Sequence, residues 1–114
     1  MNEDQVYLAH IADCITRIES YTAEGRDSFF ASTLIQDAVI RNLQTLAEST
    51  RRISTALKNA NPSVEWRNIG SFRNVIAHNY LGIDLSQIWA IVESDLPELK
   101  LQIEKILGDV QGES

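Results

Sequence analysis

The sequence is poor in the residues that define several protein classes. Its 114 residues include a single cysteine, Cys14, which excludes an internal disulfide and a multi-thiolate metal site. Two prolines and five glycines exclude collagen-like and Pro/Gly-rich disordered chains. No run approaches the roughly 20 consecutive apolar residues that span a bilayer, and residues 1–4 are acidic where a signal peptide is basic. These absences predict one small, soluble domain over residues 1–114, in a reducing cytoplasm and without membrane contact.

The formal net charge of −6 argues at first against nucleic-acid binding, which normally depends on Lys and Arg. The charge is unevenly distributed, however. Residues 41–73 carry six basic residues against two acidic ones, giving +4, while the segments on either side each carry −5. The middle of the chain is therefore a basic island between acidic ends. A solvated helix face explains such an island equally well, so the charge alone does not decide between the two interpretations.

Apolar residues recur at steps of three and four along nearly the whole chain, which is the spacing of amphipathic helices. The first helix covers residues 6–18, and Gly25 suits a left-handed position at its C-terminal end. The second begins near Asp27 or Ser32, both acceptable N-caps. Its apolar pattern spans residues 34–57, which is compatible with one long helix.

Further helices follow a turn at residues 59–62. The third runs through residues 66–76, and Asp84 caps the fourth. Residues 95–98 resemble a second start, with a proline in the first turn, and Gly108 ends the last helix. No segment alternates with period two, so the sequence predicts an all-α bundle of four or five helices.

Most familiar catalytic signatures are missing, including phosphate-binding glycine loops and zinc-binding His-Glu-x-x-His pairs. Cys14 occupies an apolar helical position, which favours a buried structural thiol over a nucleophile. His10 has no obvious partner and is interpreted as a histidine that is either solvated or at the edge of the core. The sequence therefore predicts no metal site and no cofactor.

One polar cluster stands out at the predicted end of the third helix, where Arg73, Asn74, His78 and Tyr80 crowd together. On a continuous helix Arg73 and His78 lie roughly 140° apart. They can act together only if the helix ends between them or if a second copy of the chain completes the site. Alternatively, Arg73 pairs with a nearby acid and His78 caps the helix C-terminus, where a cation is favourable.

The same cluster resembles a known motif. Residues 73–80 (RNVIAHNY) resemble the Arg, four residues, His, one residue, Tyr motif of HEPN-domain ribonucleases. More closely, the chain resembles HepT, the toxin of HepT–MntA toxin–antitoxin pairs. Residues 36–43 (QDAVIRNL) are similar to that family's second-helix signature, and residues 66–69 (WRNI) and 96–99 (LPEL) also fit. Four blocks in order carry the resemblance over nearly the whole chain.

The resemblance implies a metal-independent endoribonuclease that acts as a homodimer with a composite active-site cleft. In the family's terms, His78 exchanges the proton of the ribose 2′-OH, a task suited to an imidazole with a pKa of ~6.5. Arg73 holds the scissile phosphate, and Asn74 orients either group. Tyr80 is the residue to which a cognate nucleotidyltransferase antitoxin, MntA-like, transfers AMP. The remaining candidates for contact with the RNA backbone are Arg41, Arg51, Arg52 and Arg67.

Two other interpretations stay open. One is a non-catalytic HEPN-type module that binds a nucleotide or a partner protein. The other is a structural bundle that dimerises through Trp66 and Phe72.

Overall fold

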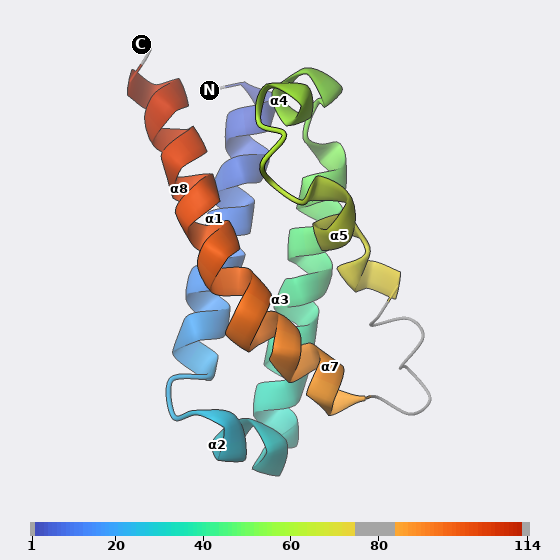
Figure 1. Ribbon diagram of the computed structural model, residues 1–114. Coiled ribbons are helices and arrows are strands. Elements are labelled where there is room, and N and C mark those ends of the chain that lie inside the picture. Colours follow the sequence, from blue (N-terminus) through green and yellow to red (C-terminus); the bar gives the residue numbers. More distant parts are fainter. Residues whose placement is uncertain (1, 75–83, 113–114) are drawn as a thin grey trace.

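The computed structural model describes residues 2–74 and 84–112, and these residues contain helices and no strand. The all-α prediction is therefore confirmed, but the described residues form about six helices, with the continuous C-terminal helix counted once, where four or five were predicted. Two long helices, α1 (Glu3–Tyr21) and α3 (Thr33–Arg52), lie antiparallel, and the C-terminal helix crosses one side of the pair (Figure 1). Within the described residues, no helix is both long and apolar enough to cross a membrane.

The remaining elements are short. Helix α2 (Arg26–Ala31) lies at the end of the bundle where α1 finishes, and α4 (Thr55–Ala60) lies at the opposite end (Figure 1). Helix α5 (Trp66–Gly70) packs beside α3. The C-terminal helix consists of α7 (Leu85–Ala90), a π-helical segment η1 (Ile91–Asp95) and α8 (Leu96–Gly112), without a break.

The core forms where the apolar stripes of α1, α3 and α8 meet. Burying these side chains is the main favourable contribution to folding, at roughly 25 cal/mol per Å² of apolar surface. Most of the stripe positions expected from the sequence are buried; those without access to solvent are Ile11, Ile15, Ile18, Val39, Leu43, Leu46, Ala47 and Ile103. Leu34, expected at the start of the second stripe, is 81% exposed, so that expectation is wrong.

Side-chain caps define several helix starts. The Asn2 side chain accepts from the Gln5 N–H at 2.8 Å, and the Gln5 side chain accepts from the Asn2 N–H at 3.0 Å, forming a capping box. Ser32 caps α3 by accepting from Ile35 N–H at 3.2 Å. Asp84 caps α7, as the sequence predicts.

Helix α3 ends at Arg52, so its continuation to Leu57 is not observed. Ile53 adopts an extended conformation (φ −64°, ψ 139°) and is buried. Ser54 then donates from its N–H (2.8 Å) and from its hydroxyl (2.6 Å) to the Asp4 carboxylate of α1. The Ser54 hydroxyl also accepts from Leu57 N–H and so caps α4. A contact between residues 50 positions apart thus ends the helix, which local spacing could not indicate.

Gly25 has the predicted left-handed backbone (φ +95°), but it precedes α2 and does not terminate α1. Helix α1 already ends at Tyr21, and Thr22 is its C-cap. The two candidate starts, near Asp27 and at Ser32, both exist, because α2 and α3 are separate helices.

The predicted break at residues 95–98 is also wrong, and the apolar spacing gives the reason. Along the C-terminal helix, successive buried residues are three or four positions apart, except for one step of five between Ile91 and Leu96. In a regular α-helix five residues turn the side chain roughly 140° away from its starting face. Here Leu96 N–H bonds to Ile91 O, five residues back, and the wider π-helical turn returns Leu96 to the core.

Pro97 is accommodated by the same segment. A proline inside an α-helix lacks an N–H and clashes with the carbonyl four residues earlier. That carbonyl belongs to Glu93, inside η1, where the backbone departs from the α-helical path. The last helix therefore continues to Gly112, and Gly108, expected to end it, lies within α8.

Candidate functional site

An open groove of about 580 Å³ lies where α5 meets the end of α3. We refer to it as the basic groove, because arginines are the only charged residues among those that line it. It is bordered by Arg51 from α3, by residues of α5 and by the helical residues 72–74 that follow. The lining residues are Arg51, Arg67, Gly70, Ser71, Arg73 and Asn74.

The arginine and asparagine side chains that residues 67–74 contribute to the groove are exposed because the apolar residues between them face the core. Ile69 and Phe72, three residues apart, are buried against the core, so Arg67, Arg73 and Asn74 remain exposed. Phe72 is buried within its own chain, so the expectation that it contributes to a dimer contact together with Trp66 is wrong for Phe72. Trp66 is only partly buried.

Arg51 is held in place from two sides. A Cβ atom at Gly70 would lie 3.9 Å from Arg51 Cγ, so the Arg51 stem passes directly over α5. Its guanidinium lies 3.8 Å from Glu48. The neighbouring Arg52 pairs more closely with Glu48, at 3.3 Å, and does not line the groove. The Tyr7 hydroxyl and then the Glu48 carboxylate raise the pKa of Arg52.

The charge of the groove suits an anion. Among the described residues, Arg67 and Arg73 form no ion pair, and no carboxylate lines the groove. Guanidinium groups donate in a fixed fork that matches phosphate oxygens. The arrangement can therefore hold the phosphates of a polyanionic ligand.

The structure brings together four of the predicted site residues: Arg51, Arg67, Arg73 and Asn74. Arg41 lies elsewhere, in a groove between α1 and α3. His78 and Tyr80 lie outside the described residues. Sequence reasoning missed Gly70 and Ser71 as lining residues, although both lie between the two candidates Arg67 and Arg73.

Cys14 and His10 behave as predicted. Cys14 is 4% exposed, and burial, together with the charge of Asp13, raises the pKa of its thiol. The thiol is therefore protonated and a poor nucleophile. His10 is exposed, with its ring edge-on to Tyr7 at 6.1 Å between centroids. In the described part of the chain, no group of three or more His, Cys, Asp or Glu side chains could hold a metal ion.

A smaller pocket between α5 and the C-terminal helix is acidic. Asp95, Glu65 and Glu98 all line it. Burial and then the charge of Glu98 raise the pKa of Asp95 above its ordinary 3.8. The folded state thus binds the Asp95 proton more tightly than the unfolded state does. Ionisation of Asp95 therefore destabilises the fold at neutral pH, and protonation removes that penalty.

We expect Asp95→Asn to raise the unfolding temperature slightly at pH 7, because the amide carries no charge to desolvate. The difference from wild type should shrink as pH falls through the raised pKa of Asp95 and vanish below its ordinary value. Thermal unfolding followed by circular dichroism between pH 7 and pH 3 measures it. A variant less stable than wild type at pH 7 would contradict the assigned penalty.

Comparisons with known proteins agree with the sequence motifs. The family profile described as "Ribonuclease HepT-like" matches residues 11–106. The chain is 35% identical over 101 residues to "Probable ribonuclease HepT" of Thermococcus cleftensis, across 88% of this chain and 92% of that protein. It is equally identical, over 101 residues, to "Putative RNase MJ1380" of Methanocaldococcus jannaschii, across 88% and 93% of the two chains.

A third relative is larger. The chain is 33% identical over 107 residues to "Gamma-glutamylcyclotransferase and putative RNase MJ0434" of Methanocaldococcus jannaschii. The match covers 93% of this chain but 48% of that protein, so the chain spans about half of that relative's length. No solved structure gives a significant match. On the family profile and on relatives matched over most of their length, the chain belongs to the HepT-like ribonuclease family.

Proposed function

We propose that the chain is a metal-independent endoribonuclease, the toxin of a toxin–antitoxin pair. The observation that carries the proposal is the basic groove, where three arginines and Asn74 meet at the start of the Arg-x4-His motif. Membership of a ribonuclease family supports the RNA substrate. A groove lined by guanidinium groups and free of carboxylates suits an RNA backbone better than a neutral ligand.

The proposed reaction needs no group beyond the chain and the RNA. His78 takes the proton from the ribose 2′-OH, and the resulting oxygen attacks the adjacent phosphorus. The P–O5′ bond breaks, the leaving 5′-oxygen takes a proton, and the products are a 2′,3′-cyclic phosphate and a 5′-OH end. Arg73 binds the phosphate and stabilises the charge that develops on its oxygens. Asn74 orients one of these two groups.

A homodimer would provide two copies of this motif in one composite cleft. Arg73 and His78 are five residues apart, a step that points their side chains about 140° apart on a continuous helix. A second copy of the chain removes that difficulty by supplying the missing group from across a two-fold interface.

The direct test uses purified protein and total RNA in EDTA. Cleavage that leaves 2′,3′-cyclic phosphate ends supports the proposal. Absence of cleavage at every protein concentration contradicts it and favours a non-catalytic module. Cleavage only after Mg²⁺ is restored contradicts metal independence alone.

Arg51→Gln should weaken the binding of single-stranded RNA. A plot of log affinity against log salt concentration has a negative slope, and each lost phosphate contact makes that slope shallower by about 0.7. Fluorescence anisotropy with a 2′-O-methyl oligonucleotide measures this without cleavage. Arg52→Gln is the matched control, because Arg52 is adjacent, equally charged and paired with the same Glu48, yet lies outside the groove.

Glu48→Gln should have the opposite effect and strengthen binding, since Glu48 is the carboxylate that pairs with Arg51. Equal losses for Arg51→Gln and Arg52→Gln would show a diffuse electrostatic effect and contradict a defined groove.

Silencing of the enzyme is proposed to occur at Tyr80, through AMP transfer by a cognate nucleotidyltransferase. Tyr80→Phe should fold, retain at least part of its RNase activity and escape silencing, because only the acceptor hydroxyl is lost. Incubation with the partner, ATP and Mg²⁺ should add AMP to the wild type but not to the variant. Trypsin places Tyr7, Tyr21 and Tyr80 in three different peptides, so mass spectrometry identifies the acceptor directly.

AMP on the peptide with Tyr7 or Tyr21 would disprove the assignment. Equal silencing of both proteins without a mass change would show that the partner acts by occlusion.

A further inference from the structure

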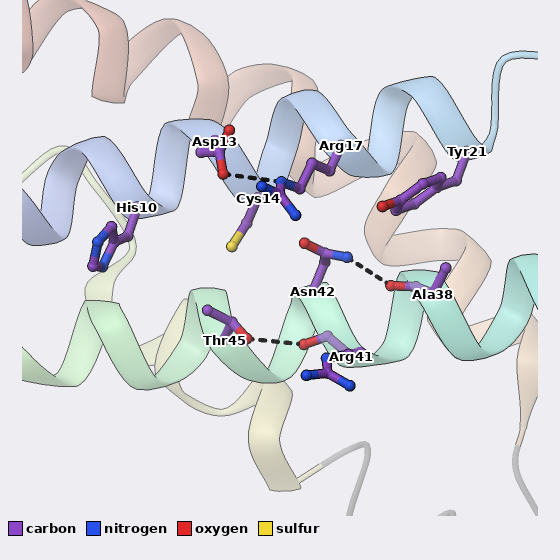
Figure 2. Close-up of a pocket in the computed structure, with 9 residues that line it drawn as sticks. All are labelled: His10, Asp13, Cys14, Arg17, Tyr21, Ala38, Arg41, Asn42 and Thr45. Atoms are coloured by element: carbon purple, nitrogen blue, oxygen red, sulfur yellow. Dashed lines mark hydrogen bonds and ion pairs between the residues drawn. The ribbon is translucent and has the colours of Figure 1, made fainter.

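A second groove, of about 520 Å³, runs between α1 and α3. We name it the α1–α3 groove. It is partly open to solvent, and both helices contribute lining residues, with the two rings coming from α1 (Figure 2). The residues that matter to the argument are His10, Arg17 and Tyr21 from α1, and Arg41, Asn42 and Thr45 from α3.

The α3 side of the groove also carries two uncharged polar side chains, Asn42 and Thr45, which bond to the backbone of α3. Asn42 Nδ2 donates to Ala38 O at 2.8 Å. The Thr45 hydroxyl donates to Arg41 O at 3.2 Å. These two hydrogen bonds orient both side chains along α3 (Figure 2).

The charged lining residues are Arg17, Arg41 and Asp13, so the arginines outnumber the single carboxylate. Arg17 Nε donates to Asp13 Oδ2 at 3.0 Å, and the Arg17 side chain is still 60% exposed. The ion pair therefore orients the guanidinium while leaving much of it open to solvent. Arg41 is exposed and forms no ion pair with any described residue.

Aromatic rings stand at both ends. His10 lies at one end and Tyr21 at the other, with the arginines between them (Figure 2). The two residues are eleven positions apart on α1, which corresponds to a rise of about 16 Å along the helix axis. The Tyr7 ring packs edge-on against His10, and Tyr21 is 38% exposed. Cations combined with exposed rings along an open groove are typical of sites for single-stranded nucleic acid.

The α1–α3 groove and the basic groove share no lining residue, but both border α3. Arg41 and Arg51 are ten residues apart, which places them about 15 Å apart along the axis and within a quarter turn of each other. A single strand held by Arg51 can therefore continue along α3 to Arg41.

We propose that the α1–α3 groove is a second contact site for single-stranded RNA, which extends the strand held in the basic groove. Arg17 and Arg41 bind phosphates, and Tyr21 and His10 stack on bases. This inference rests on the proposed ribonuclease function and adds the path of its substrate.

The test is a length series of 2′-O-methyl oligonucleotides, from about 4 to about 16 nucleotides. These analogues cannot be cleaved, because the attacking hydroxyl is blocked. Wild-type affinity should rise once the strand reaches the α1–α3 groove. The double variant Arg17→Gln, Arg41→Gln should bind short strands like wild type but lose that rise, with a salt slope lower by about 0.7 per lost contact.

Two further variants control for charge and stacking. Arg26→Gln removes a charge from α2, where Arg26 stacks on Phe30 outside the groove, and should bind every length like wild type. Tyr21→Ala should weaken binding of long strands by about fivefold or more, while Tyr21→Phe keeps the ring and should not.

Each other outcome has a distinct meaning. If the double variant binds long strands as tightly as Arg26→Gln does, the second site is disproved, while the assignment of the basic groove is unaffected. If the double variant changes the sedimentation velocity of the free protein, a second copy covers this face and the RNA assignment is wrong. If wild type binds no strand at all, the proposed function and this inference both fail.

Discussion

Arg73→Ala and His78→Ala are each expected to reduce RNA cleavage by at least about 100-fold, which is the lower end of the loss for a charge-stabilising donor and for a general acid–base group. Arg73 is exposed at the edge of the basic groove, so its truncation removes little apolar burial. Folding should therefore be nearly unaffected, within about 1 kcal/mol. Cleavage rates at saturating RNA measure the first effect, and the helical circular dichroism signal and urea unfolding measure the second.

Arg73→Lys separates the two roles of the arginine. It keeps the charge but loses the two-pronged donor geometry, so it should bind RNA well and cleave it poorly. Full activity in either alanine variant would disprove the catalytic role of that residue. Unfolding of a variant would indicate a structural role instead.

Phe29→Ala is expected to destabilise the fold by about 3–5 kcal/mol. Phe29 is fully buried and attaches the six-residue helix α2 to the bundle. Its ring lies 5.3 Å from both the Phe30 and the Trp89 rings. A small domain has a total stability of about 5–15 kcal/mol, so the loss is large. Urea unfolding followed by circular dichroism gives the free energy.

Leu34→Ala is the matched control, since Leu34 is close in sequence but 81% exposed. It should change stability by less than about 0.5 kcal/mol. Similar effects of both substitutions would show that helix propensity matters here, not burial.

The buried faces of the helices could be predicted from the sequence because they depend on local periodicity. The same holds for Ser32 and Asp84, whose side chains bond to backbone two or three residues away. Cys14 was identified as buried for the same reason: it falls on the apolar stripe of α1.

The end of α3 could not be predicted in this way. It depends on Asp4, which lies 50 residues before Ser54 and accepts two hydrogen bonds from it. Spacing along one segment contains no information about such a partner. Pro97 misled for a related reason, because proline normally marks a helix start and here lies inside a continuous helix.

The candidate site was predictable in composition but not in grouping. Five arginines were candidates, and only packing of α5 on α3 separates Arg51, Arg67 and Arg73 from Arg41 and Arg52. Charge counting treats these arginines alike. His78, the proposed proton-transfer group, and Tyr80, the proposed AMP acceptor, lie outside the described residues, and their roles stay predictions.

The π-helical segment η1 makes the C-terminal helix one residue longer than its core needs. Removing a residue such as Ser94 would shorten the five-residue step between Ile91 and Leu96 to four, which an ordinary α-helix satisfies. The same removal would place the carbonyl four residues before the proline in an α-helical position, where the ring of Pro97 clashes with it. The extra residue and the proline are thus compatible only as a pair. In a related chain, loss of one of them should be accompanied by loss of the other, so that insertions and prolines at this point of the helix vary together.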